Sequence, residues 1–306
     1  MNLTEKILSC PSVPGDGRQM EELLKGELCI NGVSFSKDAL GNLFFTKTVT
    51  DGRNVMLCTG LDVGGVIATY VEGSKIYVNA LGDCGDMQKI AYSKVVFDGI
   101  SGILVPPDGF TAGTSLADCH VETYDKSAAE KVSLGSKGYF DIPYNKLGDD
   151  IYWGYGVAQK LCISRVCQEA EKLFGDDALL KKLNIGSVTV AFLGQSSLMS
   201  RGSSVAANSV NPDDVILVSP FDCKRNGKGI DSSDRIIVKI LDKAYVGDTS
   251  LTEEICRYLE EKEIPFKKAV SLEANPVLAN LSRADSCPRC AYVCLAAFHG
   301  GLMFNN

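Results

Sequence analysis

Histidine is scarce in this chain of 306 residues: it occurs only at His120 and His299, and tryptophan occurs once. Because protein zinc sites commonly use imidazole ligands, two histidines leave little material for one. No apolar run reaches the roughly 18–20 residues that a membrane-spanning helix needs. The first residues are also too polar for a secretory signal peptide. These absences argue against a membrane partner and predict a cytoplasmic protein.

Clusters of lysine and arginine are missing as well, and the formal net charge is −7. Binding to nucleic acid depends on basic side chains gathered on one surface, so this charge balance predicts no nucleic-acid partner. Hydrophobic residues make up 45% of the chain and charged residues 23%, as in ordinary globular proteins. The length allows one large or two medium domains with a sizeable core.

Cysteine, by contrast, occurs twelve times, mostly inside apolar runs. This distribution is typical of small buried side chains in a reducing compartment. Only Cys287 and Cys290 form a C-x-x-C pair, with Cys294 beyond it. Such a pair can be redox-active or half of a zinc site. Since no second pair exists, a loop cysteine followed by a buried strand is the simpler interpretation.

Apolar patterns predict two kinds of structure. Up to residue 65, and again from residue 150, amphipathic helices alternate with buried strands, which is typical of a sheet covered by helices. Residues 66–149 instead contain short alternating strands with turn signals every ~8–12 residues, the pattern of a small β-barrel. We therefore predict an α/β domain of residues 1–65 and 150–306 with an inserted barrel of residues 66–149.

The individual elements follow from helical and alternating periodicities. Predicted helices cover residues 3–9, 18–28, 127–132, 157–174, 197–208, 251–263 and 276–281. Predicted strands cover residues 33–36, 42–47, 54–61, 66–71, 75–81, 94–97, 102–105, 187–193, 215–218, 235–240, 266–270 and 291–297. The strand at 54–61 leads into Gly60-Leu61-Asp62, at the end of a strand where α/β sheets carry their polar chemistry.

Several short motifs follow one another in an order found in one enzyme family. Besides Gly60-Leu61-Asp62, they are Cys10–Gly15, Leu40–Leu43, Ala128–Gly135, Gln195–Gly202 and Asn211–Asp213. Together they resemble the tetrahedral (glutamyl-type) di-zinc metallo-aminopeptidases, a family also described as endoglucanase-like. The resemblance covers nearly the whole chain and implies a phosphorylase/hydrolase-like α/β fold with an inserted barrel. It also implies a homo-oligomer, at least a dimer, because the inserted domain of that family helps to build the oligomer.

The resemblance also assigns site positions. In that family two histidines, two aspartates and a glutamate hold two divalent metals, and a neighbouring glutamate is the general base. The corresponding positions here hold Gly60 for the first histidine, Ala158 for the bridging aspartate, Ser196 for the base, Ser197 for the ligand glutamate and Ser219 for the next aspartate. Asp62 is kept, but its family role is to orient the missing histidine.

Glycine, alanine and serine supply neither strong anionic ligands nor a base near neutral pH. We therefore expect a catalytically inactive homologue, a pseudoenzyme without a metal cofactor. Small residues at these positions predict an apolar, roomy cleft that binds a peptide or a small metabolite. A purely structural role in oligomer assembly is the other non-catalytic interpretation.

Two catalytic alternatives stay open. In the first, Asp62, Asp222 and His299 form a rearranged site for zinc or cobalt in an active aminopeptidase. In the second, Ser196 is the nucleophile of a serine hydrolase, because it follows a predicted strand, precedes a predicted helix and comes before Asp222 and His299 in the chain. However, Leu198 stands where the nucleophile motif requires a second glycine.

The same residues also have simpler interpretations. Asp62 can be a turn carboxylate that accepts hydrogen bonds from backbone amides. The hydroxyl groups of Ser196 and Ser197 can cap the predicted helix that follows them. His299 then lies in a terminal loop.

Overall fold

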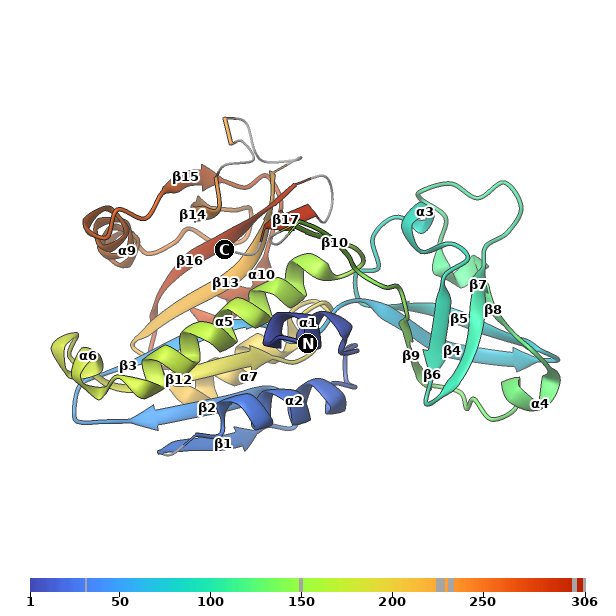
Figure 1. Cartoon of the computed structure of the whole chain (residues 1–306), viewed down its shortest axis with the longest axis horizontal. Helices are drawn as coiled ribbons and strands as arrows, with labels where there is room; N and C mark the ends of the chain where they lie inside the picture. Colours follow the sequence, from blue (N-terminus) through green and yellow to red (C-terminus); the bar gives the residue numbers. More distant parts are fainter. Residues whose placement is uncertain (31, 149–150, 224–228, 231–233, 299–301, 305–306) are drawn as a thin grey trace.

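The computed structural model describes residues 1–30, 32–148, 151–223, 229–230, 234–298 and 302–304, and these residues form two parts (Figure 1). The larger part is built on an 11-stranded sheet, and the smaller is a closed barrel of six strands. The predicted fold class, a mixed α/β sheet covered by helices together with a small β-barrel, is confirmed.

Parallel strands occupy the centre of the large sheet. Its strands are β1 (Val33–Lys37), β2 (Leu43–Thr48), β3 (Arg53–Gly60), β10 (Asn145–Leu147), β11 (Ile151–Trp153), β12 (Ile185–Leu193), β13 (Asp214–Asp222), β14 (Ile236–Leu241), β15 (Phe266–Val270), β16 (Arg289–Phe298) and β17 (Leu302–Phe304). They are arranged in the order β1-β2-β12-β3-β13-β16-β17-β11-β10, with β14 pairing β16 and β15. Because β12, β3, β13 and β16 are mutually parallel, their carboxyl ends lie along one edge of the sheet.

Helices cover both faces of this sheet (Figure 1). They are α1 (Leu3–Ser9), α2 (Arg18–Leu28), α5 (Val157–Gly175), α6 (Asp177–Lys182), α7 (Arg201–Val210), α9 (Thr249–Glu261) and α10 (Pro276–Leu281). Successive side chains of a strand point to opposite faces. Accordingly, Val190 and Phe192 of β12 belong to the core beneath α1, α2 and α5. Ala191 and Leu193 belong to the core beneath α7 and α10.

The barrel has a core of its own, formed by side chains such as Val95, Leu104 and Val121. Its elements are β4 (Gly65–Glu72), β5 (Lys75–Leu81), α3 (Met87–Ile90), β6 (Lys94–Phe97), β7 (Ile100–Val105), the 3-10 turn Leu116–Asp118, β8 (His120–Thr123), α4 (Lys126–Ala129) and β9 (Lys137–Phe140). The strands close in the order β4-β5-β8-β7-β6-β9. The predicted division of the chain into 1–65, 66–149 and 150–306 stays a prediction; β10 already pairs in the large sheet.

The predicted helix at 197–208 is wrong at its start, because α7 begins only at Arg201. Residues 195–200 instead form consecutive turns, in which Gln195, Met199 and Ser200 have positive φ angles of 54–55°. Residues other than glycine seldom adopt this left-handed conformation, so the sequence did not indicate it. The short strands β8, β9, β10 and β11 were also not predicted.

Asn42 links three separate segments at the carboxyl edge of the sheet. It is fully buried, and its Nδ2 donates to Asp38 Oδ2 at 2.6 Å and to the Gly202 carbonyl oxygen at 2.9 Å. Its Oδ1 accepts from the Gly194 amide at 2.8 Å. A Cβ on Gly202 would lie 2.3 Å from Asn42 Oδ1, so only glycine allows this approach. Through Asn42, the motif Leu40-Gly41-Asn42 therefore joins the start of β2 to the end of β12 and to α7.

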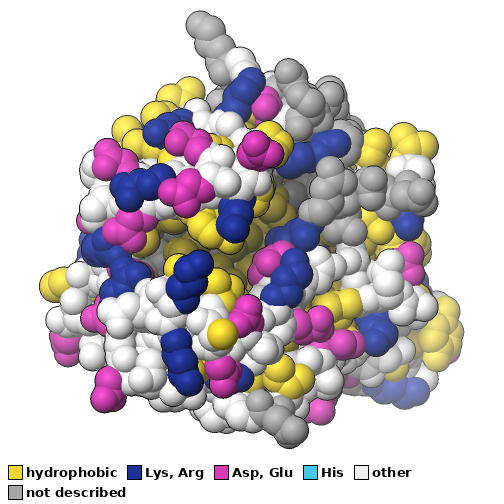
Figure 2. Space-filling view, turned by 60° about the vertical axis from the view of Figure 1, so that its left-hand side comes forward, with side chains coloured by type: hydrophobic (Ala, Val, Ile, Leu, Met, Phe, Trp, Pro, Cys, Tyr) yellow, Lys and Arg dark blue, Asp and Glu magenta, His cyan; other side chains and the backbone are white. Residues whose placement is uncertain are grey.

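The molecular surface is mixed in charge. On the face shown in Figure 2, side chains of lysine and arginine alternate with those of aspartate and glutamate, and the described residues there form no broad patch of one sign. Among the residues that the structure describes, no helix has both the length and the apolar character needed to cross a membrane.

Replacing Asn42 by alanine should destabilise the protein by about 2–4 kcal/mol. The buried Gly194 amide and Gly202 carbonyl would lose their partner, and each unsatisfied buried group costs about 1–3 kcal/mol. Urea unfolding followed by circular dichroism measures the change. The exposed Asn208→Ala of α7 is the control, for which a change within about 0.5 kcal/mol is expected. Equal effects of the two variants would contradict the role assigned to Asn42.

Candidate functional site

The centre of the candidate site is the Asp62 carboxylate, two residues after the end of β3. Its side chain is buried, and its two oxygens accept four hydrogen bonds. The amide and hydroxyl of Ser197 donate to Oδ1 at 2.9 and 2.8 Å. The hydroxyl of Ser196 donates to Oδ1 at 3.1 Å, and its amide donates to Oδ2 at 3.2 Å. Asp62 thus attaches the turn at residues 195–200 to the end of β3.

Two opposing effects act on the ionisation of Asp62. Burial is the larger effect and raises the pKa of its carboxyl group, because the charged form loses its hydration. The hydrogen bonds from Ser197 and Ser196 oppose this, since they favour the charged form. A carboxylate that already accepts four hydrogen bonds has few lone-pair positions left for a ligand.

The space beside Gly60 is closed. A Cβ placed on Gly60 would lie 2.5 Å from Ser196 Oγ and 2.9 Å from Ser196 Cβ. On another side, Gln159 Nε2 donates to the Gly60 carbonyl oxygen at 2.6 Å and to Thr59 Oγ1 at 3.1 Å. The expectation of open space at Gly60 is therefore wrong. Ser196 and Gln159 occupy the volume that a larger side chain at this position would need.

Ser197 lies at the junction with the barrel. A Cβ on Gly82, which directly follows β5, would lie 2.6 Å from Ser197 Oγ. Gly82 also has φ +87°, a conformation that L side chains rarely adopt. The hydroxyl of Ser197 is thus held between Asp62 and the backbone of the barrel. Neither Ser196 nor Ser197 caps a helix, because α7 starts at Arg201.

The other predicted site residues are spread over separate elements. Ala158 is in the first turn of α5 and packs against the small cluster around Tyr152. Ser219 lies within β13, where its hydroxyl is 3.4 Å from Cys294 Sγ of β16. Asp222 is the last residue of β13. His299 lies outside the described residues.

No metal centre is apparent in the part of the chain that the structure describes: it contains no group of three or more His, Cys, Asp or Glu side chains placed to hold an ion. The C-x-x-C pair is divided between a loop and the core. Cys287 is exposed, whereas Cys290 is fully buried in β16, and both thiols are free.

The serine-hydrolase alternative has part of the geometry it needs. Ser196 follows a strand in a tight turn, but the positive φ angles of that turn belong to Gln195, Met199 and Ser200 and not to Ser196. The Ser196 hydroxyl donates to the buried Asp62 carboxylate. His120, the one histidine among the described residues, lies in β8 of the barrel. The imidazole that a serine-histidine-aspartate triad requires is therefore not among the hydrogen-bond partners of Ser196 in the described residues.

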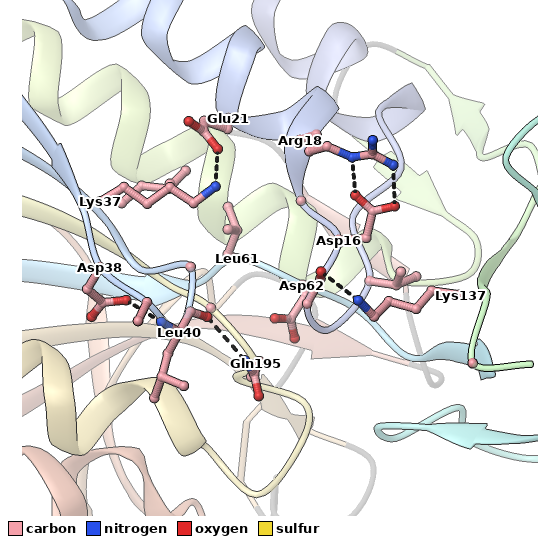
Figure 3. Close-up of a pocket in the computed structure, with 18 of the residues that line it drawn as sticks. Asp16, Arg18, Glu21, Lys37, Asp38, Leu40, Leu61, Asp62, Lys137 and Gln195 are labelled. Carbon is pink, nitrogen blue, oxygen red and sulfur yellow. Dashed lines mark hydrogen bonds and ion pairs between the residues drawn. The ribbon is translucent and has the colours of Figure 1, made fainter.

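A cavity of about 560 Å³ lies beside Asp62 (Figure 3). Its walls come from the start of α2, the link between β1 and β2, the end of β3, and the barrel. The lining includes Asp16, Gly17, Arg18, Glu21, Lys37, Asp38, Leu61, Asp62, Asp98, Lys137 and Gln195. Gly60, Ala158, Ser196 and Ser197 are not among its lining residues. The cavity is therefore polar, and of the site positions that the resemblance assigned only Asp62 lines it.

Apart from Asp62, the charged residues that line this cavity were not predicted, because they come from segments that are far apart in the sequence. Lys137 Nζ reaches across from the barrel and donates to the Gly15 carbonyl oxygen at 2.9 Å. Arg18 pairs with Asp16 at 2.9 Å and with Asp98 of the barrel at 3.3 Å. Gly15 and Gly17, close to a helix start, were a sequence signal for a turn but not for a cavity.

Because Ser196 fills the space beside Gly60, substitutions at these two positions should have non-additive effects on the free energy of unfolding. Gly60→Ala should destabilise the protein by about 1–3 kcal/mol, because the new methyl group meets Ser196. In a double-mutant cycle with Ser196→Gly, the double variant should be more stable than the sum of the single effects by about 1–2 kcal/mol. The measurement is the free energy of unfolding for all four proteins. Gly113→Ala, where a Cβ meets nothing within 4 Å, is the control. Additive effects would show that Ser196 does not fill this space.

No protein-family model matches the sequence, and no significantly similar sequence was found among curated proteins. Solved structures, in contrast, match closely. A TET aminopeptidase from the marine sediment archaeon Thaumarchaeota archaeon SCGC AB-539-E09 has a TM-score of 0.86 at 14% identity, covering 99% of this chain and 90% of that one. The TET1 peptidase of Pyrococcus horikoshii, which can assemble into a tetrahedron or a large octahedral shell, has a TM-score of 0.82 at 15% identity over 97% and 91%.

An endoglucanase from Thermotoga maritima has a TM-score of 0.75 at 15% identity, covering 100% of this chain and 92% of that one. At such low identity a structural match establishes the fold and not the activity. The chain therefore has the fold of the TET-type aminopeptidases and of related endoglucanase-like proteins.

Proposed function

We propose that this protein is a non-catalytic protein with an aminopeptidase-like fold, which neither assembles a di-metal centre nor hydrolyses peptides. The observation that carries the proposal is the closed space at Gly60, where the Ser196 side chain takes the volume that a ligating side chain would need. Asp62 is the only carboxylate that this chain keeps from the resembled site. Both of its oxygens already accept hydrogen bonds from Ser196 or Ser197.

The chemistry of the donor set also supports the proposal. Two adjacent divalent ions need several anionic or imidazole ligands to balance their charge. The positions discussed above offer no side-chain donor at Gly60 and Ala158, and neutral hydroxyl groups at Ser196, Ser197 and Ser219. These residues do not fit a pair of zinc or cobalt ions.

Two catalytic functions are the alternatives to this proposal, and experiments can distinguish each of them from it. A rearranged aminopeptidase site would use Asp62, Asp222 and His299, and it would require Asp62 to exchange its serine partners for a metal ion. A serine hydrolase of the triad type would need an imidazole within reach of the Ser196 hydroxyl, which donates to the Asp62 carboxylate at 3.1 Å. The first alternative binds metal, and the second loses activity when Ser196 is replaced.

Metal content is the most direct test. The protein is purified without a histidine tag, incubated with excess zinc or cobalt, desalted, and analysed for metal per chain by mass spectrometry. We expect far less than one ion per chain, since the ligand positions carry no strong donors. Hydrolysis of aminoacyl p-nitroanilides and of p-nitrophenyl esters should equal that of Ser196→Ala.

One or two retained ions per chain would overturn the proposal in favour of the rearranged aminopeptidase, most directly if Asp62→Asn abolished the retention. Ester hydrolysis that disappears in Ser196→Ala would instead favour the serine hydrolase. A TET-type aminopeptidase treated in parallel is the positive control for metal loading.

We also propose that the protein forms a homo-oligomer through its barrel. The structural neighbours include proteins described as a dodecamer and as a tetrahedral or octahedral shell, which supports assembly of this chain. The barrel of this chain also presents aromatic rings on its outer surface: Tyr70 is 59% exposed, and its ring centroid lies 5.8 Å from that of Tyr77. Exposed aromatic side chains are enriched at protein interfaces.

Size-exclusion chromatography with light scattering should therefore give a mass that is a multiple of 32.8 kDa. Tyr70→Asp on the barrel should reduce this mass, because a charge desolvated in an apolar interface is costly. Tyr258→Asp is the matched control, since Tyr258 is 49% exposed on α9 of the α/β part. A monomer in the unmodified protein would contradict the proposed assembly.

We further propose a cytoplasmic location. Reduced thiols persist in reducing compartments, and all twelve cysteines are free, including the exposed Cys29 and Cys287.

A further inference from the structure

Strand β1 is a free edge of the large sheet. It pairs with β2 on one side, and Figure 1 shows no other labelled element along its outer side. A strand at the edge of a sheet presents a row of backbone N–H and C=O groups to which another strand can bind. A second chain that pairs there extends the sheet, which is a recurring mode of association between proteins.

The hydrogen-bond pattern shows which backbone groups of β1 point away from β2. Just beyond the end of β1, the Asp38 amide donates to the Asn42 carbonyl oxygen at 3.2 Å, so these two residues form a hydrogen-bonded pair. In an antiparallel ladder, hydrogen-bonded pairs alternate with pairs that exchange no bond. The register of β1 on β2 is unbroken, so its odd-numbered residues belong to the second kind. The N–H and C=O groups of Val33, Phe35 and Lys37 therefore point outward.

Most of these outward groups have no partner in the part of the chain that the structure describes. The Val33 amide is an exception, because it donates to the Ile30 carbonyl oxygen at 3.1 Å. The amides of Phe35 and Lys37 and the carbonyl oxygens of all three outward residues make no hydrogen bond to another described residue. The outer edge of β1 therefore offers two donors and three acceptors within five residues.

Two other free edges of the sheet are protected, and β1 is not. β10 has only three residues, and β15 carries the adjacent lysines Lys267 and Lys268. Very short strands and lysine side chains are two means by which natural edges avoid pairing with other chains. β1 has five residues with neither proline nor bulge, and its exposed face carries the small side chains of Ser34 and Ser36. Its only charged residue is Lys37, at its end.

The charges beside this edge are balanced within one copy of the chain. Lys25 of α2 lies 2.8 Å from Glu21 and 3.5 Å from Glu22. The same ammonium group lies 4.6 Å from the centre of the Phe35 ring. Lys37 lies 2.6 Å from Glu21. Two lysines and two glutamates leave no net charge at this place, so two copies of the same surface can approach without repulsion.

We propose that the outer edge of β1 pairs with β1 of a second copy of this chain, antiparallel and about a two-fold axis beside Phe35. Phe35 then lies opposite Phe35 of the second copy, and Ser34 lies opposite its Ser36. Four backbone hydrogen bonds form, because the Phe35 amide meets the Phe35 carbonyl and the Lys37 amide meets the Val33 carbonyl, each twice by symmetry. The inference goes beyond the proposed function, since this interface lies in the α/β part and does not use the barrel.

The side chains of β1 suit this pairing. The Phe35 ring packs beside Phe45 of β2, with 5.1 Å between the ring centroids, and the ring of the second copy extends this row of aromatic side chains. Aromatic residues directly opposite each other stabilise an antiparallel pair, and so do opposed hydroxyl side chains. The two Lys37 side chains lie at opposite ends of the paired segment, about 13 Å apart along the strands. This separation exceeds a Debye length of about 10 Å, so salt screens their repulsion.

Analytical ultracentrifugation of the full chain over a range of concentrations tests the proposal. The Tyr70→Asp protein is the background, so that association through the barrel does not contribute. We expect this protein to form a dimer of twice 32.8 kDa. Adding Lys37→Pro should weaken the dimer by roughly tenfold or more, because proline removes an outward amide that does not pair with β2. Lys37→Ala is the matched control: it also removes the ion pair with Glu21 but keeps the amide, and the dimer should persist.

A second pair of variants tests the register. Ser34→Lys combined with Ser36→Lys places like charges opposite each other across the interface and should weaken the dimer. Ser34→Lys combined with Ser36→Glu places opposite charges there and should preserve or strengthen it. Both positions are exposed in a single copy, so each variant should fold, which circular dichroism checks.

Three results would overturn the proposal. The first is a Tyr70→Asp protein that stays monomeric at every concentration. The second is equal association of the Lys37→Pro and Lys37→Ala proteins. The third is equal association of the two proteins substituted at Ser34 and Ser36, which would place the interface on another surface. None of these results bears on the barrel interface, which the unmodified protein tests separately.

Discussion

The acceptance of four hydrogen bonds by Asp62 is the interaction on which the rest of the site depends. A carboxylate buried at the end of a strand is costly unless donors surround it, and here Ser196 and Ser197 supply all four. These bonds fix the turn after β12 against the turn after β3. That turn holds three residues other than glycine in the left-handed conformation, and such strain persists only where surrounding contacts enforce it.

This arrangement closes one space and leaves another open. With Ser196 held on Asp62, the volume beside Gly60 is filled, and Ser197 is pressed against Gly82 of the barrel. The hollow that remains lies along the start of α2, where charged side chains from the barrel and the α/β part meet. Hydrogen bonds between the two serines and Asp62 hold the centre of this arrangement together.

The fold is shared with TET-type aminopeptidases at only 14–16% identity, and this is physically reasonable. A fold of this kind depends on alternating apolar residues in the strands, on helices that cover both faces, and on a few buried links such as Asn42. None of these requirements involves the side chains that perform chemistry. A scaffold therefore survives while its site changes, and fold alone does not determine activity.

The sequence by itself determined the scaffold. The pattern of apolar residues predicted α1, α2 and α5 to within one residue, and it predicted the central strands with less accurate ends: β13 was predicted as residues 215–218 and covers Asp214–Asp222. The motif with Asn42 and the small residues at Gly60, Ser196 and Ser197 were also readable. Only the tertiary structure decided what those small residues do. Ser196 donates to Asp62 from more than 130 positions away in the sequence, and Lys137 donates to Gly15 from more than 120 positions away. Such contacts depend on how segments far apart in the sequence pack together, and no local pattern encodes the cavity that those segments line.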